Sequence, residues 1–116
     1  MWFSLASQTA QPTGDDRRKS RRFPYPHRQP VAPVIDGVLP NQADFVEVLF
    51  RDISMEGFSF YSPNEFPAQQ LVARLGSEPN TVYVLARMVH QKEVWHQDAW
   101  VYQVGCEILS KLTGRI

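Results

Sequence analysis

Residues 45–60 read FVEVLFRDISMEGFSF, and this stretch decides the fold class. Its first half alternates between apolar and polar positions, so that Val46, Val48 and Phe50 share one face of an extended chain. A polar turn follows at residues 54–57, after which phenylalanine and serine resume the alternation. Two alternating segments joined by a short turn are typical of an antiparallel hairpin. The stretch therefore predicts two strands of a β-sheet.

Strand patterns also precede and follow this hairpin. The longest predicted strand, residues 81–94, is rich in Val, Leu and Met, and we expect a hairpin connection after it at 95–99. The other predicted strands lie at residues 31–35, 71–76 and 100–109, although 71–76 is also compatible with a helix. The apolar face of the last strand consists of Trp100, Tyr102, Val104, Cys106 and Ile108. Five or six strands with short loops predict a mainly all-β, antiparallel sandwich or small barrel, followed by at most a short C-terminal helix.

The composition fits a single globular domain. The 116 residues leave room for one domain, and a hydrophobic content of 43% is enough to fill a core. The single cysteine, Cys106, excludes an internal disulfide framework and a Cys-rich zinc module. No apolar run approaches the roughly 20 residues of a membrane-spanning helix, and the apolar start lacks the basic leader of a signal peptide. We therefore expect a soluble, cytoplasmic protein with no membrane contact.

The formal net charge of zero conceals an uneven distribution along the chain. Residues 1–28 carry six basic and two acidic side chains, a balance of +4, and residues 29–116 carry six basic and ten acidic ones, a balance of −4. Positive charge gathered in one segment is suited to binding an anion, although a solvated basic tail has the same composition. We expect a flexible leader at residues 1–16, a basic ligand-binding arm at 17–30 and a β-domain at 31–109.

The basic arm contains the motif Arg-x-x-x-Arg in two frames. Its sequence RRKSRR places Arg17 four residues before Arg21, and Arg18 four residues before Arg22. Guanidinium groups donate paired hydrogen bonds to phosphate oxygens and to the O6/N7 edge of guanine, and they stack on planar rings. A flexible segment with two such groups is suited to holding a doubly charged nucleotide.

A second motif, Asp-x-Ser-x-x-Gly, occupies the turn of the central hairpin with Asp52, Ser54 and Gly57. One interpretation is local: Asp and Ser cap the turn, and Gly57 supplies a positive φ angle. The other is functional: the carboxylate and the hydroxyl read polar groups of a base or ribose, and Gly57 leaves room for a ring. The motif by itself does not decide between these two interpretations.

Together the two motifs resemble the PilZ family of bacterial receptors for cyclic di-GMP. An Arg-x-x-x-Arg arm enters an antiparallel β-domain, and Asp-x-Ser-x-x-Gly follows between two strands. The segments 84–89 and 102–108 also resemble the closing strands of that family, which often carry a glycine before the last apolar residues. The resemblance covers residues 17–109 and implies a six-stranded antiparallel β-barrel. Its main departure is the 29 residues that separate Arg22 from Asp52.

The resemblance implies a binding site for cyclic di-GMP. Arg18 and Arg22 would grip the phosphates and stack on or pair with guanine, and Arg17 and Arg21 form the alternative frame. Asp52 and Ser54 would hydrogen-bond a guanine or its ribose, and Gly57 would keep that surface open. We prefer the first frame because Arg22 directly precedes Phe23 and the path into the first strand.

The function expected from this resemblance is that of a second-messenger receptor or adaptor. The segment from Asp15 to Arg28 would be mobile without ligand, become ordered around the nucleotide and then present a different face to a protein partner. Two alternatives remain open: a protein-interaction module of the same fold that binds no nucleotide, and a nucleic-acid binder that uses the basic arm. The second is disfavoured because the β-domain is acidic and few aromatic residues interleave with the basic ones.

No set of residues indicates an enzyme or a metal site. His90, His96 and Cys106 lack the close spacing of metal ligands. Cys106 falls on the apolar face of the last strand, where we expect a small core residue. We therefore predict no catalytic residues, no metal and no cofactor, with cyclic di-GMP as the ligand.

Overall fold

The computed structural model describes residues 21–113 of the 116. These residues form seven β-strands and one 3₁₀ helix: β1 (Phe23–Pro24), β2 (Arg28–Val34), η1 (Gln42–Asp44), β3 (Val46–Ile53), β4 (Gly57–Ser62), β5 (Gln70–Ser77), β6 (Asn80–His96) and β7 (Ala99–Leu112). The predicted leader at residues 1–16 and the start of the basic arm, with Arg17 and Arg18, lie outside the described residues.

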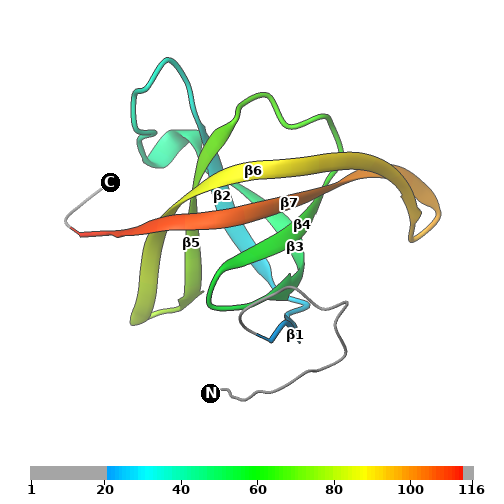
Figure 1. The fold of residues 1–116 in the computed structure, drawn as a ribbon, viewed down its shortest axis with the longest axis horizontal. Helices are drawn as coiled ribbons and strands as arrows, with labels where there is room; N and C mark the ends of the chain where they lie inside the picture. The colour runs from blue at the N-terminus through cyan, green and yellow to red at the C-terminus, as the bar shows by residue number, and fades with distance from the viewer. Residues whose placement is uncertain (1–20, 114–116) are drawn as a thin grey trace, which may run out of the picture.

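Six of the strands close into an antiparallel barrel. They follow the order β3-β2-β5-β6-β7-β4, and β4 pairs with β3 to complete the circle (Figure 1). The seventh strand, β1, adds to β3 through the pairs Phe23↔Ile53 and Pro24↔Asp52. Closure leaves each barrel strand paired on both sides over part of its length, which removes long free edges. The predicted six-stranded barrel is confirmed.

The interior of the barrel is filled by aromatic and branched side chains. Phe50, Phe58 and Phe60 form a stacked cluster with ring centroids 5.1 to 6.3 Å apart, and each is at most 1% exposed. The other buried apolar side chains of this core are Val31, Val48, Phe66, Leu71, Ala73, Leu75, Val84, Ala86, Val104 and Cys106. From Val48 to Phe60 the alternation thus builds one wall of the core. Val46, predicted to share the face of Val48 and Phe50, is 61% exposed, because the core does not extend to this end of β3.

Strand β2 begins at Arg28, three residues before the predicted start at Val31. Its first half pairs with β3 and its second half with β5, and Val31 takes part in both pairings. Pro30 and Pro33 therefore each have one unpaired side, which accommodates a residue that cannot donate a backbone hydrogen bond. The prolines exclude a helix here, as predicted, but they do not prevent a strand.

The hairpin of β6 and β7 extends past the barrel (Figure 1). Its last pairs are Trp95↔Trp100 and His96↔Ala99, and Gln97 and Asp98 form the turn with positive φ angles. Trp100 is 62% exposed, so the apolar face predicted for the last strand does not reach the core at this end. The alternation continues along β7, but the barrel interior ends before it reaches this tryptophan.

The end of the chain also differs from the prediction. Residues 110–112 belong to β7, where Ser110 pairs with Leu85 and Leu112 with Tyr83. The exceptional length of β6 provides a partner for these residues, so they continue the sheet where a short C-terminal helix was expected. No helix among residues 21–113 has the length and apolar character needed to cross a membrane.

Candidate functional site

Strand β1 brings the basic arm against the Asp-x-Ser-x-x-Gly motif. Pro24 lies opposite Asp52, and the preceding Arg22 reaches the same carboxylate. The Arg22 Nη1 atom lies 2.9 Å from Asp52 Oδ1, and the side chains are 26% and 16% exposed. The structure therefore joins one arginine of the arm motif to the first residue of the turn motif.

The carboxylate of Asp52 accepts hydrogen bonds from three side chains. Arg22 and the Ser59 hydroxyl both donate to Oδ1 at 2.9 Å, and Arg51 donates to Oδ2 at 2.9 Å. An irregularity in the β3–β4 register lies between Phe50 and Asp52, and a bulge of this kind re-aims neighbouring side chains. These contacts fix the carboxylate on the outer face of the barrel. We call Arg22, Asp52 and Ser59 the Asp52 cluster.

The two arginines of the arm that are described have different surroundings. Arg22 belongs to the Asp52 cluster, whereas the Arg21 guanidinium carbon lies 5.5 Å from the centre of the Phe23 ring. The latter is a cation–π contact at an exposed position. The surroundings of Arg22 are consistent with the preferred frame, whose other member, Arg18, lies outside the described residues.

Ser54 holds the turn between β3 and β4. Its hydroxyl oxygen accepts hydrogen bonds from the backbone N–H groups of Glu56 at 3.1 Å and Gly57 at 3.2 Å. The backbone N–H of Ser54 donates to the Gly57 carbonyl at 2.8 Å. The local interpretation of this serine is therefore confirmed, and contact of Ser54 with a ligand stays a prediction.

Gly57 is required by the packing of two strands. The positive-φ glycines of the described chain are Gly37 and Gly76, so the expected positive φ at Gly57 is wrong. A Cβ atom at Gly57 would lie 2.2 Å from the backbone carbonyl oxygen of Cys106 on β7. Only glycine permits this approach of β4 to β7. The predicted role of Gly57 in keeping a ligand surface open stays a prediction.

Cys106 is a core residue, as expected from the alternation. It is 1% exposed and unpaired with any other cysteine. Burial raises the pKa of its thiol from 9.0 to about 12, and the positive charge of Arg22 lowers it by less than burial raises it. A thiol that is buried and protonated is not available as a nucleophile at neutral pH.

Ser59 is a member of the Asp52 cluster that the motifs do not single out. It lies opposite Asp52 in the β3–β4 register and is buried. The hairpin itself indicates that Ser59 lies beside Asp52. Ile53 pairs with Phe58 across the turn, so the next pair away from the turn is Asp52 with Ser59. Cross-strand neighbours on one face lie about 5 Å apart, within reach of a hydrogen bond between side chains.

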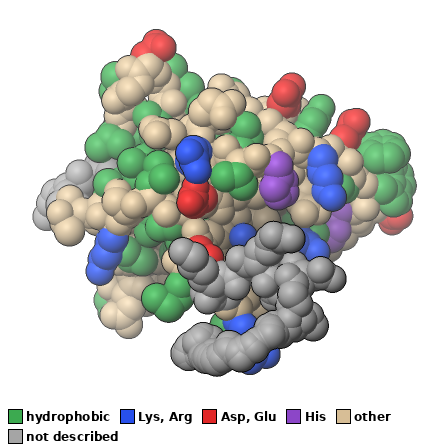
Figure 2. Space-filling view, viewed as in Figure 1, with side chains coloured by type: hydrophobic (Ala, Val, Ile, Leu, Met, Phe, Trp, Pro, Cys, Tyr) green, Lys and Arg blue, Asp and Glu red, His purple; other side chains and the backbone are tan. Residues whose placement is uncertain are grey.

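An ion pair lies beside the turn motif. Figure 2 shows basic, acidic and His side chains in a band across this view of the molecule. Arg87 on β6 and Glu107 on β7 form an ion pair. Gly57 lies opposite Glu107 in the register of β4 and β7, so this ion pair borders the turn motif.

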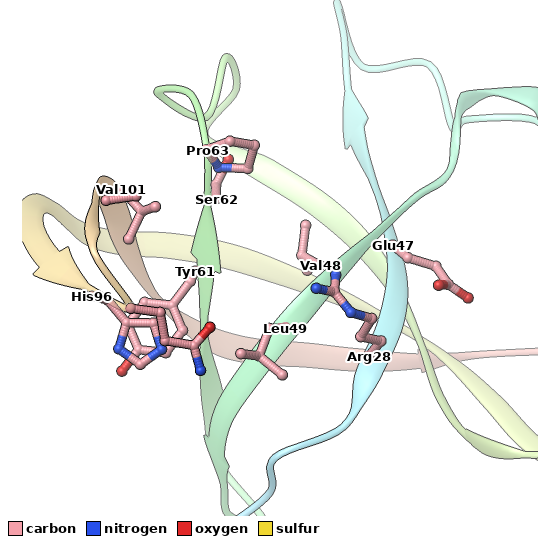
Figure 3. Close-up of a pocket in the computed structure, with 11 residues that line it drawn as sticks. Arg28, Glu47, Val48, Leu49, Tyr61, Ser62, Pro63, His96 and Val101 are labelled. Carbon is pink, nitrogen blue, oxygen red and sulfur yellow. The ribbon is translucent and has the colours of Figure 1, made fainter.

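A separate pocket of about 300 Å³ lies between the barrel and the hairpin of β6 and β7. Figure 3 shows Arg28 and Glu47 on one side of it and the rings of Tyr61 and His96 on the other. These two rings stack with centroids 4.0 Å apart and an interplanar angle of 11°. Arg28, within the predicted ligand-binding arm at 17–30, lines this pocket, but none of the described motif residues does: Arg21, Arg22, Asp52, Ser54 and Gly57. The predicted site and the pocket are therefore distinct features of the surface.

A scan against models of protein families finds no match for this sequence, and neither does a search of curated proteins. Among solved structures, the fold is similar to the PilZ domain with c-di-GMP of YcgR from Escherichia coli. The TM-score is 0.54 at 13% sequence identity, and the similarity covers 81% of this chain and 79% of that chain. At this identity the similarity concerns the fold. The described chain is a β-barrel of PilZ architecture.

Proposed function

We propose that this chain is a non-enzymatic receptor for cyclic di-GMP. The observation that carries the proposal is the contact between Arg22 and Asp52, because it brings the arm motif and the turn motif onto one surface. The similar solved structure is a PilZ domain with c-di-GMP, which supports the same ligand class. An arginine and a carboxylate side by side offer both a donor for phosphate or O6/N7 and an acceptor for the N–H groups of guanine.

Because Arg22 and Asp52 pair with each other, a nucleotide that binds either side chain would compete with this ion pair. Arg22 and Asp52 already satisfy each other, so a nucleotide must share or replace this contact. Ser59 and Arg51 keep Asp52 in position when Arg22 turns toward a phosphate. The exchange conserves charge-assisted hydrogen bonds, and this limits its free-energy cost.

Ordering of the arm is the proposed response to the ligand. Within the described residues, Tyr25 packs against the core and the backbone N–H of Tyr25 donates to the Arg51 carbonyl. The segment from Tyr25 onward is therefore attached to the barrel without ligand. The response would concern the residues before it, and hydrogen–deuterium exchange of residues 15–24 with and without cyclic di-GMP would measure it. Unchanged exchange at saturation would contradict this response, even if the nucleotide binds.

The test of the receptor function is isothermal titration calorimetry with cyclic di-GMP and with GTP. We expect saturable binding of cyclic di-GMP alone, and loss of that binding in the folded double variant Arg18→Ala/Arg22→Ala. Binding that survives in this variant would move the site to Arg17 and Arg21. A folded wild type that produces neither heat nor a thermal shift with cyclic di-GMP would refute the proposal. Binding to any DNA or RNA with steep salt dependence would indicate a nucleic-acid binder.

A protein-interaction module of the same fold is the second candidate. It is favoured by Trp95 and Trp100 at the end of the hairpin, which are 59% and 62% exposed. Their rings meet edge to face with centroids 5.4 Å apart, and exposed tryptophans of this kind are enriched where proteins bind each other. This candidate predicts no affinity for cyclic di-GMP, and a defined partner that binds the wild type but not the variant Trp95→Ala/Trp100→Ala.

A further inference from the structure

Four residues form a cross-strand row on the outer face of the barrel. The register places Asp52 opposite Ser59 and Ser59 opposite Gly105. Gly105 in turn lies opposite His90 on β6. Directly paired residues project from the same face of a sheet. The row therefore begins at the Asp52 cluster and ends at His90, on a strand that carries neither sequence motif.

The ring of His90 occupies the space above Gly105. A Cβ atom at Gly105 would lie 2.3 Å from His90 Nε2, 2.6 Å from Cε1 and 2.9 Å from Cδ2. The imidazole thus extends from β6 over the backbone of β7, and Nε2 lies nearest the glycine. Neighbouring strands are about 4.8 Å apart, so roughly one strand spacing separates this edge of the ring from the position of Ser59.

His90 has no structural partner that would explain its position. Its side chain is exposed, and no hydrogen bond joins its ring to residues 21–113. On the N-terminal side of His90 along β6, the charged side chain of Arg87 already forms an ion pair with Glu107. Lys92 follows two residues later on β6, opposite Gln103. The ring nitrogens of His90 are therefore available to a ligand that lies on the row.

We propose that His90 contacts the edge of a guanine base held between it and Asp52, and that it selects guanine over adenine. This inference rests on the proposed binding of cyclic di-GMP. Guanine carries the acceptors O6 and N7 on one edge and an N2 amino donor on another, whereas adenine has an amino donor in place of O6. Asp52 accepts hydrogen bonds, and His90 donates from Nε2 in the tautomer that carries its proton there. The row thus offers an acceptor at one end and a donor at the other.

The experiment measures affinities for cyclic di-GMP and cyclic di-AMP by calorimetry on the full chain. His90→Ala removes the ring, and His90→Phe keeps a flat ring without nitrogen atoms. His96→Ala is the matched control, because it removes a histidine from the same strand that stacks on Tyr61 away from the row. We expect both His90 variants to bind cyclic di-GMP about 3- to 10-fold more weakly, the effect of one neutral hydrogen bond, and to lose guanine preference by the same factor. The control variant keeps the wild-type affinity.

A measurement on the wild type complements the variants. The ¹⁵N chemical shifts of the His90 ring report hydrogen bonding at Nε2, and we expect this signal to move when cyclic di-GMP is added. An unmoved signal, or both His90 variants binding like the wild type, would overturn the inference and leave the receptor proposal standing. Full affinity in His90→Phe with loss in His90→Ala would show that the ring packs without selecting the base. A wild type that does not bind cyclic di-GMP would overturn both proposals.

Discussion

Arg22 and Asp52 lie 30 positions apart in the sequence, and their side chains meet at 2.9 Å on the outer face of the barrel. The ion pair is only partly buried, so solvent screens most of its Coulomb energy. Its main consequence is positional, because it places the end of the arm over the β3–β4 hairpin. The contribution of this ion pair to the free energy of unfolding can be measured directly.

The coupling between these two residues should be small and salt-dependent. A double-mutant cycle of Arg22→Ala and Asp52→Ala, measured by urea denaturation, should give about 0.5–1 kcal/mol of coupling at low salt. At 1 M NaCl the coupling should fall, because the screening length shortens to about 3 Å. A coupling above about 3 kcal/mol would indicate a buried ion pair and contradict the partial exposure seen here.

The two described arginines of the arm should differ in their effect on binding. Arg22→Ala should weaken the affinity for cyclic di-GMP by about 10-fold or more, since charge-assisted hydrogen bonds contribute about 1.5–3 kcal/mol. Arg21→Ala is the matched control, because it removes the same charge from the neighbouring position that faces Phe23. Calorimetry on both variants decides between the frames, and a larger loss in Arg21→Ala would favour Arg17 with Arg21.

The two glycines that face neighbouring strands should respond differently to substitution. Gly57→Ala places a methyl group 2.2 Å from the Cys106 carbonyl oxygen, and β4 and β7 must separate to accept it. We expect a loss of about 1–3 kcal/mol in the free energy of unfolding. At Gly105 the three atoms nearest to an added Cβ all belong to the His90 ring, which can rotate away, so the loss for Gly105→Ala should stay below about 1 kcal/mol.

Urea denaturation with far-UV circular dichroism compares the two glycine variants. In the His90→Ala background, Gly105→Ala should be neutral for stability, because the obstructing ring is absent. A cost for Gly105→Ala that persists in this background would mean that the backbone, rather than the imidazole, fills the space beside Gly105.

Cys106 should make the stability of the protein fall at alkaline pH. Burial raises the pKa of its thiol in the folded state to about 12, above the value of 9.0 for an exposed thiol. The unfolded chain therefore releases this proton first, and between pH 9 and 12 it binds fewer protons than the folded chain. The contribution of the thiol is fully present below pH 9 and is lost as the pH rises through this window, by at most about 1.4 kcal/mol per pH unit.

Comparison with Cys106→Ala isolates this contribution from other alkaline titrations. The difference in the free energy of unfolding between wild type and variant should narrow as the pH rises from 9 to 12. Alkylation offers a second readout: the native thiol should react slowly with iodoacetamide at pH 8, and at the rate of a free thiol in urea. Fast alkylation of the native protein would contradict the burial of Cys106.

Much of the barrel could be predicted from alternation alone. The period of two in residues 45–60 and along β7 placed Phe50, Phe60 and Cys106 inward, and burial confirms all three. Alternation reports which side chains share a face but carries no information on where a barrel ends. Trp100 continues the pattern of β7 and still lies in solvent, because β6 and β7 are longer than the barrel is deep.

The site was predictable to a different extent from the fold. The turn motif singles out Asp52, which the structure joins to Arg22, and the register of the same hairpin would have added Ser59. Ligand contact by Asp52 and Ser54 stays a prediction. His90 could not have been identified from the sequence in this way, because the register of β6 and β7 shifts between Met88 and His90. A shift of one residue decides which side chain faces outward opposite Gly105, and no local pattern in the sequence specifies it.

The attachment of the arm by two residues of β1 has a thermodynamic consequence. Upstream of Tyr25, strand β1 and the Arg22–Asp52 pair hold the described arm on the barrel, and neither is large. Where contacts this few hold a segment, each change of 1.4 kcal/mol alters the ratio of attached to released populations tenfold. Modest changes in ionic strength or temperature should then change the fraction of molecules whose arm is attached to the barrel. This fraction would depend on the solution conditions as well as on the ligand.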